Sequence, residues 1–141
     1  MKKKWIYYGI FFTENQQKAL LKRANTILKE LNKGDIPLSW QTYCEHMTII
    51  YNNKSVEREE IAEGMELMLG NIYSLHINSI GISDKAIAFG VDNFETQNKT
   101  SHITIAVAPG EKPVESNNIS NWIKLEKGFT IKGRLNVQRP T

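Results

Sequence analysis

The feature of this sequence that most constrains its fold is the alternation of apolar and polar or small residues in its second half. Residues 73–78 read "YSLHIN" and residues 87–91 read "IAFGV". Because successive side chains of a strand point to opposite faces, this period of two predicts two strands with one buried face each. Ser83 and Asp84 lie between the two segments and favour a turn. The chain therefore contains at least one antiparallel hairpin.

Other segments predict helices and further strands. The run "TENQ" from Thr13 has the pattern of a capping box, and apolar residues follow it at helical spacing. A second helix is expected to begin at Ser55, where acidic residues favour the positive end of the helix dipole. A short helix is expected at "NISNWI", residues 118–123. Further strands are expected over residues 5–12, 44–51, 101–108 and 129–137.

No linker or low-complexity tract divides the 141 residues, which indicates one domain, 1–141. The order of elements predicts the α+β class, with a mainly antiparallel sheet covered by helices on one face. The single cysteine, Cys44, excludes an internal disulfide and is expected to be a small buried residue. The sequence does not indicate an oligomeric state.

The net charge of +3 is too small for a protein that neutralises many phosphates of duplex DNA. A small anionic ligand or a short single strand remains compatible with it. The apolar run "WIYYGIFF" is short and aromatic, which favours a strand over a signal peptide. No apolar stretch has the length of a membrane span. We therefore expect a soluble, cytoplasmic protein.

Two strand segments carry the same short motif. "CEHMTIIY" places His46 two residues before Thr48, and "SHITIAVA" places His102 two residues before Thr104. On a strand, each histidine shares a face with its threonine, while the apolar neighbours point into the core. If the two strands lie close together, two imidazoles and two hydroxyls meet at one place.

Such a set of side chains suits phosphodiester chemistry without a metal. One neutral histidine accepts a proton from the attacking oxygen, and the other, protonated, donates one to the departing oxygen. The threonine hydroxyls donate hydrogen bonds to the non-bridging phosphate oxygens. A single His-x-Thr would more often be an ordinary buried histidine, but two copies among only three histidines favour a shared site.

We do not expect the other acidic and histidine residues to take part in this site. No pattern of Asp, Glu or Cys supplies further metal ligands beside His46 and His102, so we expect neither a metal nor another cofactor. His76 lacks a threonine two residues on and is expected at the surface. Glu45 is expected to point away from His46, because it is adjacent to it on the strand.

The paired motifs "HMTI" and "HITI" resemble the signature of the 2H phosphoesterase superfamily, and the order of elements is compatible over most of the domain. The resemblance implies a bilobal α+β fold with helices outside and a central cleft. It implies catalytic roles for His46, Thr48, His102 and Thr104. Members of this superfamily include 2′,3′-cyclic phosphodiesterases and the phosphodiesterase domains of tRNA ligases.

The opening "YYGI", the tryptophan before "CEHMTI" and the segment "KPVESN" also resemble phage anti-CBASS phosphodiesterases, which degrade cyclic oligonucleotide signals. The leading hypothesis is therefore metal-independent cleavage of 3′-5′ phosphodiester bonds in a cyclic oligonucleotide. An RNA 2′,3′-cyclic phosphodiesterase of the RNA-repair type is the alternative within this chemistry. A module that binds nucleotides without turnover is a third hypothesis.

Four further residues are candidates for substrate binding. Tyr7 and Trp40 are expected to stack on bases, although each is equally compatible with packing in the core. Lys132 and Arg134 share the polar face of the last strand and are candidates for neutralising phosphates. The competing explanation, slightly favoured, is that they form an exposed basic pair on an edge strand.

Overall fold

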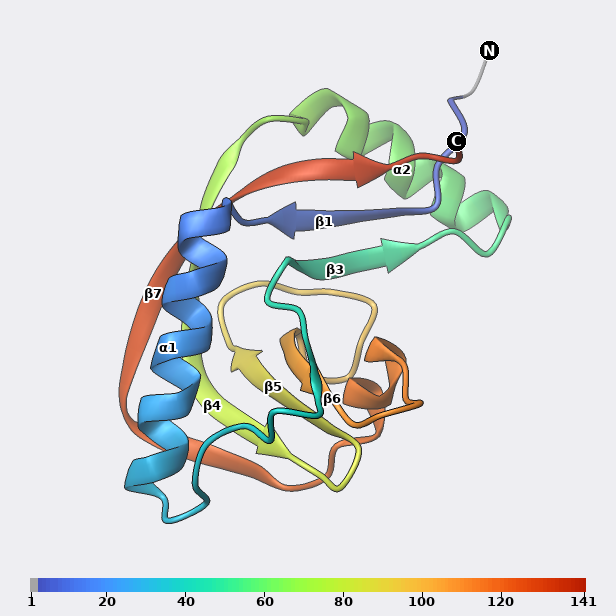
Figure 1. Ribbon diagram of the computed structural model, residues 1–141. Coiled ribbons are helices and arrows are strands. Elements are labelled where there is room, and N and C mark those ends of the chain that lie inside the picture. Colours follow the sequence, from blue (N-terminus) through green and yellow to red (C-terminus); the bar gives the residue numbers. More distant parts are fainter. Residues whose placement is uncertain (1–2) are drawn as a thin grey trace.

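Seven antiparallel strands form one sheet in the computed structural model, which describes residues 3–141 (Figure 1). The order of strands across the sheet is β2-β6-β5-β4-β7-β1-β3. The bounds are β1 Tyr7–Phe11, β2 Gln41–Thr42, β3 His46–Tyr51, β4 Ile72–Ile82, β5 Ala86–Val91, β6 His102–Val107 and β7 Trp122–Gln138. The α+β class and the antiparallel sheet that the sequence predicts are therefore confirmed.

Two α-helices begin at the caps that the sequence indicates. α1 (Glu14–Glu30) has a complete capping box, in which the Thr13 and Gln16 side chains accept hydrogen bonds from each other's backbone N–H groups. α2 (Val56–Met68) is capped by Ser55, whose hydroxyl accepts from the Arg58 N–H. No helix within residues 3–141 combines the length and the apolar character needed to cross a membrane.

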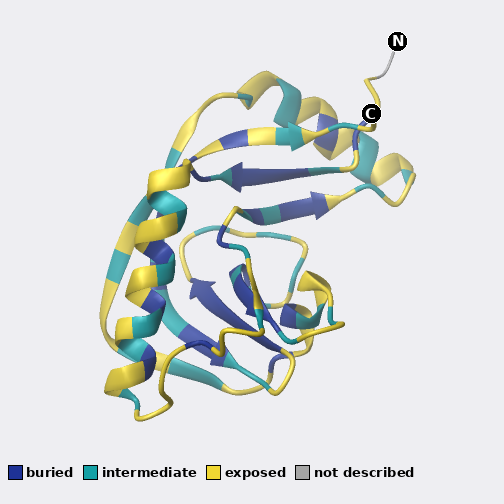
Figure 2. Ribbon diagram, in the orientation of Figure 1, coloured by how far each residue is buried: buried dark blue, intermediate teal, exposed yellow. Residues whose placement is uncertain are grey.

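The hydrophobic core lies on the face of the sheet that the helices cover. Leu20, Ala24 and Leu28 from α1 and Ala62 from α2 belong to one cluster with the inward residues of the strands. Figure 2 shows β5 buried along its whole length, because it lies inside the sheet between β4 and β6. This packing holds the strands that carry the two His-x-Thr motifs.

One segment joins the two ends of the sheet. Residues 41–44 pair with β6, with Cys44 N–H donating to the Thr104 carbonyl over 2.9 Å, and the next residues pair with β1. The change of partner occurs at Cys44, whose φ of 63° lies in the left-handed region. We call residues 41–51 the junction segment. It brings β3 beside β6, although β3 is the last strand in the order and β6 is the second from the other end.

The C-terminal part of the chain differs from the sequence-based expectation in two ways. The expected helix over residues 118–123 is wrong: a 3-10 helix, η1, covers Pro113–Asn118, and Trp122 already belongs to β7. β7 also lies between β4 and β1, so Lys132 and Arg134 are not on an edge strand. The isolated sequence of β7 does not show this, because pairing partners come from elsewhere in the chain.

Candidate active site

The two His-x-Thr motifs line one cavity. β3 supplies His46 and Thr48, β6 supplies His102 and Thr104, and the cavity between them has a volume of about 400 Å³. The four side chains share this cavity because the intervening Met47 and Ile103 are fully buried on the core face. The alternation of apolar and polar residues in the two motifs therefore places both histidines and both threonines on one cavity wall.

Other elements complete the wall of the cavity. Glu45 lines it beside His46, which contradicts the expectation that Glu45 points away. The reason is the left-handed Cys44, which interrupts the strand just before Glu45, so regular alternation does not extend back to it. The remaining lining residues, which sequence reasoning missed, are Tyr43, Tyr51, Asn98, Pro113, Val114 and Asn117.

His102 is anchored by a backbone carbonyl. Its Nδ1 lies 2.7 Å from the Thr100 carbonyl oxygen. A carbonyl only accepts, so Nδ1 carries a hydrogen and the neutral ring keeps its lone pair on Nε2. Burial lowers the pKa of His102 below its ordinary value, and the bond to Thr100 opposes that shift.

His46 lacks such an anchor. Its Nδ1 is buried and has no hydrogen-bond partner within residues 3–141. Burial, followed by the proximity of His102, lowers the pKa of His46 to about 4. A positive charge on His46 is therefore disfavoured in the free protein, and a single added proton is held by His102 in preference to His46.

An aromatic cluster holds the His46 ring. The Tyr7 ring stacks on it with a centroid distance of 4.9 Å, and the Phe11 ring lies 5.2 Å away. Burial, followed by Tyr51 and Glu45, raises the pKa of Tyr7 to about 12, so its hydroxyl stays protonated at neutral pH. Tyr7 thus stacks on a histidine ring that lines the cavity but does not line the cavity itself; base stacking by Tyr7 stays a prediction.

The hydroxyl of Thr104 has a buried partner. Its Oγ1 lies 2.8 Å from Oγ of Ser116, which is only 1% exposed and comes from η1. Either oxygen can be the donor. The contact holds the Thr104 side chain in one position while leaving it on the wall of the cavity.

The other three candidates for substrate binding, like Tyr7, do not line this cavity. Trp40 is half-buried and packs against the hydrophobic core. Arg134 is separated from His46 by Phe11 across the sheet, and its guanidinium donates to the Gly70 carbonyl. Lys132 pairs with Ser74 of β4 beyond the end of β1. Roles for these three in substrate binding stay predictions.

The described residues contain no group of three or more His, Cys, Asp or Glu side chains arranged to hold a metal ion. His76, expected at the surface, is half-exposed, and its Nδ1 pairs with Asp92 over 2.7 Å. The absence of a metal requirement stays a prediction for experiment.

Comparisons with known proteins find a matching protein family and a solved structure of similar fold. A family model described as the fungal tRNA ligase phosphodiesterase domain matches residues 15–138. A solved structure, described as the crystal structure of a fungal RNA kinase, superposes with a TM-score of 0.62 at 16% identity. The superposition covers 99% of this chain and 46% of that one, so this chain spans about half its length and the likeness is one of fold. No match was found among curated proteins.

Proposed function

Because the chain belongs to the family of the fungal tRNA ligase phosphodiesterase domain, we propose that it opens 2′,3′-cyclic phosphates at the ends of RNA. The observation that carries the proposal is the single cavity lined by both His-x-Thr motifs. Two imidazoles and two hydroxyls around one space supply the proton transfers and the anion contacts that such a reaction requires.

The contacts of the histidines support a division of roles between them. His46, which is neutral near pH 7, takes a proton from water as the water oxygen attacks phosphorus. One ester bond of the cyclic phosphate breaks, and protonated His102 gives its Nε2 proton to the departing ribose oxygen. The product is a phosphomonoester on the other hydroxyl. The Thr100 carbonyl supports this role of His102, because it accepts from Nδ1–H in both the charged and the neutral ring.

The threonines act on the phosphate oxygens. Charge accumulates on the non-bridging oxygens as water attacks, and hydroxyl donors on the cavity wall stabilise it. Thr48 and Thr104 line the cavity with the histidines, and Ser116 holds Thr104. In this way the attacking water, the phosphate and the leaving oxygen each have a partner in the chain.

A cyclic oligonucleotide is the second candidate substrate. The sequence features that resemble phage anti-CBASS phosphodiesterases favour it, and the same histidines serve both reactions. There a 2′-hydroxyl would attack the neighbouring phosphorus and the bond to the 5′-oxygen would break, with His102 protonating that oxygen. The family match favours the RNA end.

One substrate panel tests the proposal. The protein is incubated with an RNA oligonucleotide that ends in a 2′,3′-cyclic phosphate and with cyclic di- and trinucleotides, with and without excess EDTA, and the products are separated by chromatography. We expect the terminal cyclic phosphate to become a monoester in the presence of EDTA.

Two variants complete the test. His46→Ala and His102→Ala should each lower kcat by about 10²- to 10⁴-fold, the usual contribution of one acid or base, while circular dichroism stays unchanged. Binding of every substrate without any product would overturn the proposal in favour of a module that sequesters nucleotides. Near-normal turnover by either variant would remove that histidine from the mechanism.

A further inference from the structure

A second cavity, larger than the catalytic one, shares a lining residue with it. It has a volume of about 680 Å³, and its wall includes Trp122, Ser79 and Gly90 together with the loop of residues 92–100. Asn98 lines both this cavity and the catalytic cavity. A ligand whose phosphate lies between the two histidines therefore has room to continue past Asn98 towards Trp122.

The sheet brings the floor of this cavity next to His102. Gly90 of β5 is paired with His102 of β6, so the two residues lie side by side on the same face. The ring centroids of His102 and Trp122 are 6.5 Å apart. The indole thus lies within the span of one nucleotide from the ring that is assigned to protonate the leaving group.

Two glycines create the space that Trp122 and the cavity occupy. A Cβ at Gly81 would lie 2.6 Å from the indole carbons Cε3 and Cζ3, so only glycine admits the ring there. A Cβ at Gly90 would lie 2.1 Å from Oγ of Ser79 and would fill the floor beside His102. The ring is further held by its Nε1–H, which donates to the Ile119 carbonyl over 3.1 Å. A half-exposed indole held in this way is a rigid platform.

From these contacts we infer that the Trp122 cavity binds the nucleobase of the nucleotide that carries the reacting phosphate. An aromatic side chain offers a stacking surface to any base, which suits a substrate recognised first by its phosphate. The side-chain amide of Asn98 lies between the two cavities, where it can donate to the base or the sugar. The inference rests on the proposed function, because it places the phosphate between His46 and His102.

The test compares two replacements that both remove the bond to Ile119. Trp122→Phe keeps an aromatic face, whereas Trp122→Leu keeps apolar volume without one. Each is made in the His46→Ala background, so that ligands bind without turnover. The ligands are adenosine 2′,3′-cyclic phosphate and methyl riboside 2′,3′-cyclic phosphate, which lacks a base, and Kd is measured by calorimetry.

We expect Trp122→Leu to weaken binding of the adenosine ligand by about tenfold, the usual effect of losing one base stack, and Trp122→Phe to restore most of it. The ligand without a base should bind all three proteins equally. A purely structural role of Trp122 would instead weaken both ligands and affect both variants alike. Trp5→Phe, which changes a buried tryptophan that donates to Glu59 and lines neither cavity, is the matched control.

The outcomes separate this inference from the proposed function. Suppose that the parent turns over the cyclic phosphate, but Trp122→Leu binds the adenosine ligand as tightly as Trp122→Phe does. The inference is then wrong and the proposed function stands. Suppose instead that no substrate is turned over, but Trp122→Leu weakens binding of the adenosine ligand and Trp122→Phe restores it. The cavity is then a nucleobase site and the proposed function is wrong.

Discussion

At the scale of single residues, the two histidines differ in the partner of their Nδ1 atoms. His102 donates to the Thr100 carbonyl, whereas His46 Nδ1 has no acceptor within the described residues. A hydrogen-bonded imidazole tolerates a positive charge better than one enclosed by apolar groups and aromatic rings. The motif in the sequence is the same in both strands, so this difference comes from the loop before β6 and could not be read from the motif.

The pH profile of kcat/KM follows from these pKa shifts. The active form carries one proton on the pair, and both imidazole pKa values lie below the ordinary 6.5, with that of His46 at about 4. As the pH rises through the pKa of His102, the proton for the leaving group is lost. We expect kcat/KM to be maximal below about pH 6.5 and to fall by about tenfold per pH unit above the pKa of His102. Rates that rise between about pH 6 and pH 8 would contradict this assignment.

At the scale of elements, the sequence predicts the strands and caps well and the connections poorly. Alternation locates β3 and β6 because their apolar residues face one core, and the capping box locates the start of α1. The left-handed Cys44 and the length of β7 depend on pairing with distant strands. The sequence therefore predicts the cavity residues that belong to the two strand motifs. It does not predict Glu45, Asn98 and Asn117, because they lie in connections between strands.

The pairing of β1 with β3 depends on a glycine. Gly9 lies opposite Thr48, and a Cβ there would lie 2.7 Å from the Met47 carbonyl oxygen. Because this neighbour is backbone, it cannot turn aside. Gly9→Ala should lower the free energy of unfolding by about 1–3 kcal/mol in urea denaturation, and it should lower kcat by displacing β3.

Gly64 in α2 supplies the matched control. Nothing lies within 4 Å of a Cβ at that position, and alanine favours a helix interior over glycine. Gly64→Ala should therefore raise the free energy of unfolding by about 0.5–1 kcal/mol and leave turnover unchanged. A Gly9→Ala protein as stable and active as the parent would show that β3 can shift without disturbing the site.

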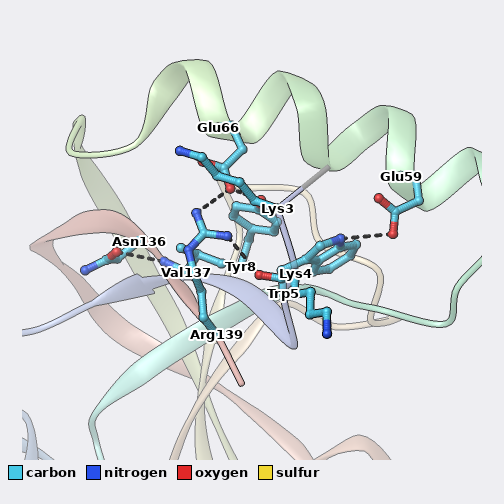
Figure 3. A network of polar contacts seen from close by, with 9 residues as sticks. All are labelled: Lys3, Lys4, Trp5, Tyr8, Glu59, Glu66, Asn136, Val137 and Arg139. Carbon is cyan, nitrogen blue, oxygen red and sulfur yellow. Dashed lines mark hydrogen bonds and ion pairs between the residues drawn. The ribbon is translucent and has the colours of Figure 1, made fainter. Parts of the chain in front are cut away.

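At the scale of the whole molecule, a polar network ties the first and last strands to α2 (Figure 3). Glu66 of α2 accepts hydrogen bonds from the Tyr8 hydroxyl and from the guanidinium of Arg139, which also donates to the Lys4 carbonyl. Burial alone would raise the pKa of the Glu66 carboxyl, but these donors outweigh burial and hold it below its ordinary value.

The network predicts how stability depends on pH. A carboxyl whose pKa is lowered by folding stabilises the protein above its unfolded pKa, near 4.5, and this contribution is lost as the pH falls through the folded pKa. Urea denaturation should therefore show the parent more stable than Glu66→Gln at neutral pH, with the difference disappearing in acid. Glu63→Gln, an exposed change on the same helix, is the control. A difference that is constant between about pH 3 and pH 7 would mean that the charge of Glu66 is not involved.

The junction segment has a practical consequence through Cys44. This residue is 1% exposed, and burial, followed by Glu45, raises its pKa to about 12. Alkylating reagents react with thiolates, so iodoacetamide modifies the protein's single thiol only after this part of the chain has separated from its neighbours. The rate of carbamidomethylation, followed by mass spectrometry, therefore measures how often the junction segment separates from β6.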